Sequence, residues 1–420
     1  MKRLNRWLES LALDHSPDFA ECRSFLASHF PLLNEFENTE QDKEWHAEGN
    51  VAIHTDMVLQ ALYALLSSRA THIQGAERQV LILSALLHDI AKPLTTRRRD
   101  IAGVERVVAS GHEEIGASYL ATRLMELPLA YKSVMQIMGL VGFHQVPKLL
   151  VVKNQGYSDY FRLSLNANLE LLYWLEQADM KGRTCSDLDK QIDLLEQFRL
   201  FAEDYQLWGI EDPIEFHLRK IKLKSCQSEQ AFLDGYAIHQ LSHGDISTVE
   251  QAIAKNYEPC QHYSHLYLMC GMSGSGKSTW IEKNLEGYDV ISLDQIRKEL
   301  NGKRDCQKNR GQVLQLAKTR LKKALANKRN VVWDATNIRK DFRNTICELG
   351  ENYGALITMV VFQLKESSLR VNNRNRQYAV GDEVISSQLT KLEWPWPTES
   401  HRFLVIGENG SELYRQGTFS

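Results

Sequence analysis

The sequence contains few cysteines and no long hydrophobic segment, and each shortage excludes a class of protein. The seven cysteines are scattered over 420 residues, and no two have the CxxC spacing of a structural zinc site. An odd number of scattered cysteines also argues against a disulfide framework. The longest apolar run, Val80–Leu87, is far shorter than the roughly 20 residues that a membrane-spanning helix needs.

The chain also lacks an excess of basic charge. Its 50 Lys and Arg residues and 53 Asp and Glu residues give a net charge of −3, which excludes a protein that coats nucleic acid by charge alone. A local basic patch is still compatible with this balance. The basic N-terminal segment is followed by no apolar stretch or small-residue cleavage site, so we expect a cytoplasmic protein.

The hydrophobic pattern predicts a multidomain protein in which a helical bundle precedes an α/β domain. Residues 1–200 carry apolar side chains at helical spacing, with only one weak strand candidate, at 149–153. Residues 263–420 alternate short apolar runs with helical stretches, which is typical of a parallel sheet packed against helices. The polar residues 201–262 between them are predicted to form a helical connecting segment.

Histidine and aspartate residues recur on separate predicted helices of the first domain. They are His54, His88, Asp89, His112, His144 and Asp179. A lone histidine is more often a satisfied core residue, but polar groups on several apolar helices need partners, and one divalent metal satisfies many of them. Such nitrogen and oxygen ligands suit Mn, Fe, Co, Ni or Zn better than Ca or Mg. Lys92, one turn after Asp89, would add an ammonium group beside the site.

The segments SALLHDIAKP, SGHEEIGA and ADMKGR resemble motifs of the HD phosphohydrolase superfamily, and most closely those of the HD domains attached to bacterial CCA-adding enzymes. This resemblance covers about residues 45–185. It implies one metal held by His54, His88, Asp89 and Asp179. It further implies that a second metal, where present, also uses His112 and His144, with an aspartate bridging. The expected activity is removal of 2′,3′-cyclic phosphates or 2′-phosphates.

Residues 271–278 read GMSGSGKS and match the phosphate-loop pattern GxxxxGKS between a predicted strand and a predicted helix. The glycines let backbone N–H groups turn towards phosphate oxygens, and the helix N-terminus adds its dipole. Lys277 is expected to contact the β- and γ-phosphates of an NTP, and Ser278 to ligate Mg. The predicted nucleotide-binding residues are Gly271, Gly274, Gly276, Lys277, Ser278, Thr279, Arg374 and Arg376.

Charged residues after the predicted strands supply the other groups that a kinase needs. Asp294 follows the second strand and is placed to take a proton from an acceptor hydroxyl, although a helix N-cap is the alternative. Arg297, one turn on, would face the same crevice. Arg374 and Arg376 belong to a cluster that could close as a lid or simply line a solvated helix. The strongly basic residues 302–329 predict either an exposed helix or a wall of an acceptor channel.

These motifs resemble the phage-type 5′-polynucleotide kinases over about residues 264–390. The resemblance implies that Asp294 is the general base towards a 5′-hydroxyl and that Arg297 grips a phosphate of the acceptor strand. The family usually places two lid arginines four residues apart, whereas Tyr378 stands four residues after Arg374. The pairs Arg370 with Arg374 and Arg374 with Arg376 therefore both stay open as the lid.

The two halves together resemble the bacterial HD-Pnk family of end-healing enzymes. The resemblance implies kinase action on 5′-OH ends with ATP or another NTP and Mg, and metal-dependent removal of 2′,3′-cyclic, 2′- or 3′-phosphate ends. RNA ends, or DNA ends, would be the substrate, and a homodimer is compatible. The sequence has no KxDG-type ligase motif, so a separate ligase is expected as the pathway partner. The alternatives are an HD nucleotidase fused to a small-molecule or nucleotide kinase, and a regulatory protein that uses NTP as a switch.

Overall fold

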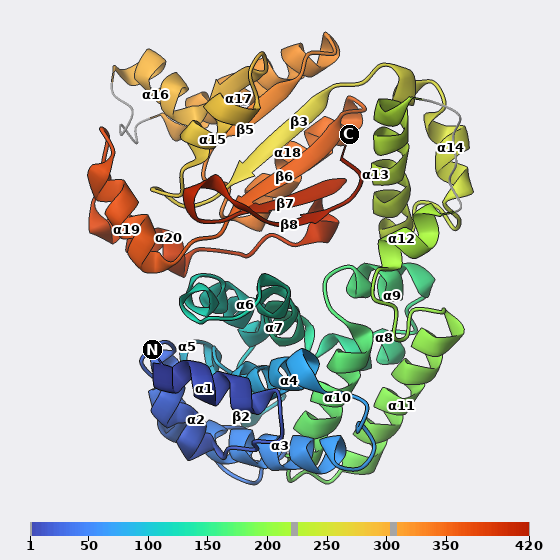
Figure 1. Ribbon diagram of the computed structural model, residues 1–420, viewed down its shortest axis with the longest axis vertical. Coiled ribbons are helices and arrows are strands. Elements are labelled where there is room, and N and C mark those ends of the chain that lie inside the picture. Colours follow the sequence, from blue (N-terminus) through green and yellow to red (C-terminus); the bar gives the residue numbers. More distant parts are fainter. Residues whose placement is uncertain (1, 220–225, 303–308, 420) are drawn as a thin grey trace. The chain divides into compact units, whose positions relative to one another are not determined.

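The computed structural model describes residues 2–219, 226–302 and 309–419. It divides the chain into two compact units, Met1–Glu211 and Asp212–Ser420, which we describe one at a time (Figure 1). The domain limits expected from the sequence, 1–200, 201–262 and 263–420, remain predictions. Cys306 and three basic residues of the predicted basic stretch, Lys303, Arg304 and Lys308, lie outside the described residues.

The first unit is a bundle of helices with one short hairpin. Its α-helices are α1 (Lys2–Leu11), α2 (Phe19–Leu26), α3 (Val51–Leu66), α4 (Gly75–Leu87), α5 (Lys92–Thr95), α6 (His112–Arg123), α7 (Tyr131–Phe143), α8 (Val146–Val152), α9 (Tyr157–Ser164), α10 (Leu169–Lys181) and α11 (Leu188–Asp204). Two 3-10 helices, η1 (Pro31–Asn38) and η2 (Leu124–Glu126), complete its helical elements. The hairpin is β1 (Arg97–Ile101) with β2 (Val104–Val108).

The apolar helix α4 lies at the centre of this bundle. Every residue from Val80 to Leu87 is buried, and the helix packs against α3, α7 and α10. Burial of a continuous apolar surface of this kind is the main stabilising term of a helical unit. Side chains cap two of these helices, α3 and α10. Asn50 accepts the N–H of Ile53 at the start of α3, and Asn168 accepts the N–H of Leu171 at the start of α10.

Two local features of the first unit differ from the sequence-based expectation. The predicted strand at 149–153 is wrong, because residues up to Val152 belong to helix α8. A four-residue apolar run does not distinguish a strand from a buried helical turn, and Pro147 favours a helix start at this point. The hairpin of β1 and β2 was not predicted, and its residues are largely exposed.

The second unit is an α/β domain whose sheet has the order β4-β5-β3-β6-β7-β8. Its strands are β3 (His265–Cys270), β4 (Asp289–Ser292), β5 (Val331–Asp334), β6 (Leu356–Phe362), β7 (Arg402–Ile406) and β8 (Glu412–Gln416). All neighbouring pairs are parallel except β7 with β8. The predicted fold class, a helical bundle followed by a parallel α/β domain, is therefore confirmed.

Helices surround this sheet. They are α12 (Pro213–Leu218), α13 (Gln227–His243), α14 (Glu250–Asn256), α15 (Lys277–Asn284), α16 (Leu293–Asn301), α17 (Arg310–Ala326), α18 (Lys340–Asn352), α19 (Glu366–Asn375) and α20 (Asp382–Thr390), with 3-10 turns η3 (Pro259–Gln261), η4 (Pro397–Glu399) and η5 (Glu408–Gly410). Helices α16 and α17 contact β4, while α13 and α18 contact β6. The hydroxyl of Tyr236 on α13 donates to the carbonyl of Ala355 at 3.0 Å, which fixes this helix to the start of β6.

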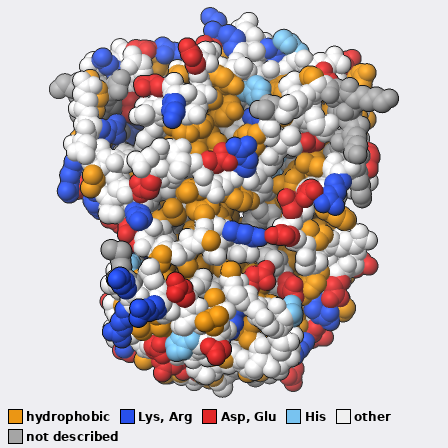
Figure 2. Space-filling model, viewed as in Figure 1, with side chains coloured by type: hydrophobic (Ala, Val, Ile, Leu, Met, Phe, Trp, Pro, Cys, Tyr) orange, Lys and Arg blue, Asp and Glu red, His pale blue; other side chains and the backbone are white. Residues whose placement is uncertain are grey.

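Among the residues that the structure describes, no single helix is both long enough and apolar enough to cross a bilayer. Basic and acidic side chains are interspersed on the face drawn in Figure 2. This mixture agrees with the near-zero net charge of the sequence.

The close approach of α7 to the chain before α10 gives a stability prediction. A Cβ atom at Gly139 would overlap the carbonyl oxygen of Asn166, whereas nothing lies within 4 Å of a Cβ at Gly156. We expect Gly139→Ala to destabilise the unit by about 1–3 kcal/mol, because backbone must move. Thermal unfolding should show a melting temperature lower by several degrees. The matched control Gly156→Ala should change it little, and equal melting temperatures would contradict the packing described here.

Candidate functional site

The six histidine and aspartate residues singled out in the sequence converge in the first unit. They come from five helices or helix ends: His54 in α3, His88 and Asp89 after α4, His112 at the start of α6, His144 after α7 and Asp179 in α10. All six are buried. Their ligand atoms form two groups, each within 4.8 Å: His54, His88 and Asp179, and Asp89, His112 and His144.

Asp89 joins these two groups. One carboxylate oxygen, Oδ2, lies 3.2 Å from His88 Nε2, and the other, Oδ1, lies 3.1 Å from His112 Nε2. Its carboxylate therefore faces both sets of imidazoles. This position suits an aspartate shared between two ions.

Backbone carbonyl groups fix the proton of three of the imidazole rings. Each ring places Nδ1 beside the carbonyl oxygen three residues earlier: His88 to Ala85 at 2.8 Å, His112 to Ala109 at 2.8 Å and His144 to Val141 at 2.9 Å. A carbonyl oxygen only accepts hydrogen bonds, so Nδ1 must carry the proton. Each ring then presents the lone pair of Nε2 to the interior of the site.

His54 is oriented in the same way by two other acceptors. Its Nδ1 lies 3.1 Å from the carbonyl oxygen of Gly182 and 3.1 Å from Oε1 of Glu48. The approach of Gly182 requires glycine, because a Cβ there would lie 2.6 Å from Cγ2 of Val58. A carboxylate or carbonyl behind Nδ1 is the usual outer partner of a metal-binding histidine.

Because the protons are fixed on Nδ1, the Nε2 atoms of the rings face each other two by two. The Nε2 atoms of His54 and His88 are 3.3 Å apart, and so are those of His112 and His144. When the rings are neutral, two nitrogen lone pairs at that distance repel each other and form no hydrogen bond. A divalent cation between them removes the repulsion, so the residues present fit a metal ion.

The charge state of the cluster also suits a metal. Burial raises the pKa of Asp89, but the neighbouring His88 and Lys92 outweigh burial and hold that pKa well below its usual value. Burial likewise opposes ionisation of Asp179, and Arg183 beside it holds its pKa well below the usual value. Burial lowers the pKa of His144 strongly, so its imidazole is neutral. Ionised carboxylates and neutral imidazoles are the forms that bind metal.

His54 differs from the other rings. Although burial lowers its pKa, hydrogen bonds to Asp179 and Glu48 outweigh burial and raise it. Protons and metal therefore compete for this residue.

The structure places Lys92 against the cluster rather than in solvent. It is buried, and its Nζ lies 2.7 Å from Oδ2 of Asp89 and 2.6 Å from the amide oxygen of Gln41. The ammonium group thus partly neutralises the shared carboxylate.

Two residues that contact the metal-ligand cluster, Arg183 and Glu48, were not predicted from the sequence. Arg183 forms an ion pair with Asp179 through Nε at 3.0 Å and through Nη2. Its spacing of four residues from Asp179 on a helix was the signal that could have found it. Glu48 precedes α3 in a loop, where no periodic pattern marks it.

Another group of possible ligands, His239, Glu351 and His401, lies in the other unit. The backbone N–H of Ile357 donates to Nδ1 of His401 at 3.0 Å, so the proton of that ring must lie on Nε2. Burial lowers the pKa of His401 well below its usual value, which keeps the ring neutral. In this tautomer Nδ1 already accepts a hydrogen bond and Nε2 carries the proton, so the neutral ring has no lone pair for a metal. The first cluster presents Nε2 lone pairs to its interior, and this group does not.

The phosphate loop connects β3 to α15, as the motif requires. Gly274 and Gly276 have φ of 83° and 90°, a backbone conformation that favours glycine. A Cβ at Gly274 would also overlap the carbonyl oxygen of Leu369. Lys277 bends back over the loop, where its Nζ donates to the carbonyls of Gly271 at 2.7 Å and Met272 at 2.9 Å. Ser278 and Thr279 are exposed at the helix start.

The other predicted kinase residues lie after the neighbouring strands. β5 adjoins β3 in the sheet, and β4 adjoins β5, so their carboxyl ends share one edge with the loop. Asp294, just past β4, is more than half exposed and forms an ion pair with Arg297 one turn on. At the end of β5, the charge of Asp334 acts on Lys277, whose pKa burial lowers.

The three arginines considered for the lid differ in position and in the charged group that each faces. Arg370 and Arg374 stand one turn apart on α19 and both face Asp382, at 3.7 and 3.0 Å. Arg376 follows the helix, and its charge contributes to the lowered pKa of Lys277. Helix α20 also contacts the loop, because Gln388 accepts the N–H of Ser273 at 2.8 Å.

Residues 51–152 match a family model described as an HD domain. Residues 266–395 match one described as an AAA domain. No curated protein matches the chain in a sequence search.

The chain therefore combines an HD phosphohydrolase domain with a P-loop kinase-like domain, and these matches point to an enzyme with hydrolase and kinase-type activity. The HD match includes five of the six clustered residues and ends before Asp179. Folding of α10 brings that aspartate to the others.

The opposed lone pairs lead to a prediction about metal binding. Dialysis against Mn²⁺, Ni²⁺ or Co²⁺ should load the protein with metal and raise its melting temperature, because ligands bind the folded state. His88→Ala should lose most of both effects, whereas His72→Ala, at an exposed position of the same unit, should keep them. Metal content measured by mass spectrometry should fall as the pH is lowered, since protons compete for His54. Equal metal content in both variants would contradict the assigned ligands.

Proposed function

We propose that this chain is a bifunctional enzyme that heals broken nucleic-acid ends, with RNA as its substrate. Its kinase unit would phosphorylate 5′-OH ends with ATP, and its HD unit would remove 2′,3′-cyclic, 2′- or 3′-phosphates. The observation that carries the proposal is the presence in one chain of two adjoining buried groups of candidate metal ligands and a phosphate loop with Asp294 and Arg297 at the same sheet edge.

The hydrolytic reaction uses the cluster of the first unit. The four histidines, Asp89 and Asp179 would hold the metal, which would supply a bound water of lowered pKa and positive charge for phosphate oxygens. The protein's own part is to keep the ligands in place: Lys92 holds Asp89, and Arg183 holds Asp179. Both cations also attract a phosphate that approaches the cluster.

Phosphoryl transfer uses the edge of the sheet in the second unit. Loop N–H groups cradle the NTP phosphates, and Lys277 exchanges its backbone carbonyl partners for phosphate oxygens. Asp294 takes the proton of the attacking 5′-hydroxyl, and Arg297 orients this carboxylate and contacts the acceptor's phosphate. Arg376 supplies positive charge near the transferred group.

A basic helix supports a polynucleotide as the acceptor. Helix α17 buries an apolar face that includes Val313, Ala317 and Leu321. Lys322 and Lys323 lie exposed beside it. Such a surface neutralises backbone phosphates irrespective of sequence. A kinase of free metabolites has no need for it. Ends healed in this way would suit a separate ligase.

One assay tests both activities on one substrate. We expect an RNA oligonucleotide with a 5′-OH and a 2′,3′-cyclic phosphate to gain a 5′-phosphate only with ATP, and to lose its 3′-terminal phosphate without ATP. Mg, Mn, Ni and Co should be compared, and both ends resolved by mass. Neither end changing with any metal would overturn the proposal and favour mononucleotides or small metabolites as substrates.

Single substitutions should separate the two reactions. Asp294→Asn should lower the kinase rate by about 10²-fold or more, because the hydroxyl loses its base, and should leave phosphate removal unchanged. Asp89→Asn should do the reverse, because it removes the carboxylate shared by both ligand groups. Circular dichroism controls for folding. Loss of both activities from a folded variant would contradict the two-site assignment.

A further inference from the structure

A cavity of about 280 Å³ opens beside the metal cluster in the first unit. Three of its residues lie next to ligands in the chain or in space: Gln145 follows His144, Met180 follows Asp179, and Arg183 pairs with Asp179. Its volume is close to the lower end of the range for small-ligand pockets, about 300–1,000 Å³. It therefore has room for one small molecule, and Arg183 links its lining to Asp179 of the cluster.

Two cations line this cavity with hydrogen-bond donors to spare. Lys148 is buried, and its Nζ lies 3.1 Å from Glu176 and 3.2 Å from the sulfur of Met180. An ammonium group has three donors, so at least one remains after these contacts. Arg183 directs Nε and Nη2 to Asp179, which leaves three of its five N–H groups. Both side chains line the cavity, and each is paired with one carboxylate and keeps N–H groups for a further acceptor such as an anion.

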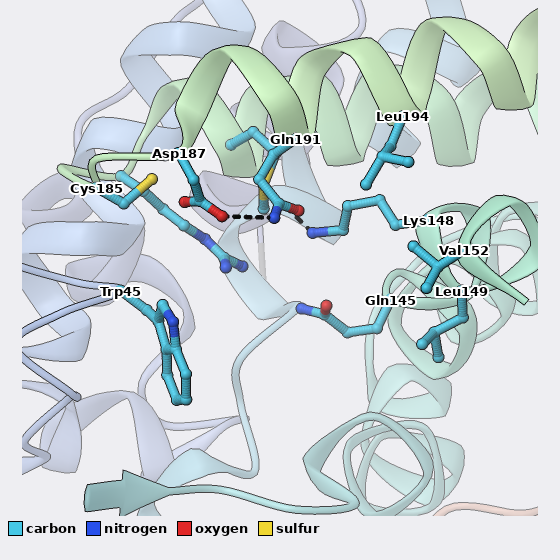
Figure 3. A pocket seen from close by; sticks show the side chains of 11 residues that line it. Trp45, Gln145, Lys148, Leu149, Val152, Cys185, Asp187, Gln191 and Leu194 are labelled. Atoms are coloured by element: carbon cyan, nitrogen blue, oxygen red, sulfur yellow. Dashed lines mark hydrogen bonds between the residues drawn. The ribbon is translucent and has the colours of Figure 1, made fainter.

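An aromatic ring faces the same cavity (Figure 3). Trp45 is 43% exposed, and the guanidinium of Arg106 lies 4.8 Å from its ring. Its loop is held in place, because Ala47 donates to the carbonyl of Thr184 at 3.1 Å and Thr184 donates to Glu48 at 2.9 Å. A half-exposed, fixed tryptophan in a cavity is a platform on which a nucleobase stacks.

Amide groups complete the lining. Figure 3 shows Gln145 and Gln191 directed into the cavity, and Gln191 donates to Asp187 at 2.8 Å. Primary amides present both donors and acceptors, which match the edge of a base. Aliphatic side chains of Leu149, Val152 and Leu194 form the remaining wall.

We propose that this cavity binds the terminal nucleotide of the strand whose phosphate is hydrolysed. Trp45 stacks on the base, while Lys148 and Arg183 hold the terminal phosphate at the cluster. This inference rests on the proposed function and names the part of its substrate that the first unit recognises: a nucleobase together with a phosphate ester, rather than a phosphate ester alone.

The test compares two RNA oligonucleotides that end in a 2′,3′-cyclic phosphate, one normal and one whose last residue lacks its base. Trp45→Ala should raise KM for the normal strand roughly tenfold, the loss expected for one base stack, with kcat little changed. It should leave KM for the abasic strand unchanged. Trp45→Phe should restore the normal value, and Trp45→Leu should not. Trp208→Ala, a ring of the same unit that packs on Tyr173 away from the cavity, is the control.

The phosphate contact is tested by a second variant. Removing Lys148 alone would leave the buried Glu176 without its ion-pair partner, so Lys148→Gln is combined with Glu176→Gln. This double variant should raise KM for both strands, by a similar factor, and weaken inhibition by inorganic phosphate. Unchanged KM for both strands would overturn the role of Lys148.

Different results would overturn the nucleotide cavity and the end-healing function. Hydrolysis of RNA ends with the same KM in wild type and in Trp45→Ala would overturn the nucleotide cavity and leave end healing intact. If no RNA end is hydrolysed, equilibrium dialysis with adenosine 3′-monophosphate decides. Weaker retention by Trp45→Ala, with inorganic phosphate retained equally, would support the cavity. Equal retention of the nucleotide would overturn it.

Discussion

The hydrolytic site depends on one constraint, the backbone carbonyl behind each imidazole. At the ends of α4 and α7 the last carbonyl groups lack helical partners, and the rings of His88 and His144 satisfy Ala85 and Val141. The hydrogen bond that completes each helix therefore also fixes the tautomer of its histidine. The rings of His54 and His112 are fixed by the carbonyl groups of Gly182 and Ala109, so the Nε2 atoms of the four rings face one another in pairs. For His88 and His144, the orientation that suits a cation is thus a consequence of how their helices end.

The second unit meets a comparable constraint with backbone groups in place of rings. Its loop must bring N–H groups to a phosphate, and the left-handed conformations of Gly274 and Gly276 permit this. The segment after β5 supports the start of the loop, because Gly271 donates to the carbonyl of Thr336 at 2.9 Å and the amide of Asn337 donates to that of Met269 at 2.6 Å. Both sites are therefore built from structure that also terminates a helix or a strand.

Those parts of the sites that carry a periodic or spaced pattern could be predicted from the sequence. The apolar helices identified His88 and His144 at their ends, and the glycine spacing identified the loop together with its strand. Strand β8 was not predicted because it is largely polar and half-exposed, and Leu149–Val152 was mistaken for a strand because an apolar run so short has no period. Glu48 and Trp45 belong to an irregular loop, so only the tertiary fold reveals that they face the cluster or its cavity.

The charges around the cluster explain why an anionic substrate suits it. Asp89 and Asp179 are each matched by a cation, Lys92 and Arg183, and burial lowers the pKa of His144 strongly, which keeps that ring neutral. The ligand frame is thus close to neutral apart from Glu48, whose pKa is lowered against the effect of burial by hydrogen bonds with His46 and then His54. Each divalent ion that enters adds two positive charges that the frame does not cancel. A phosphate ester and a hydroxide ion supply the missing negative charge, whereas a neutral substrate would leave it unbalanced in a buried site.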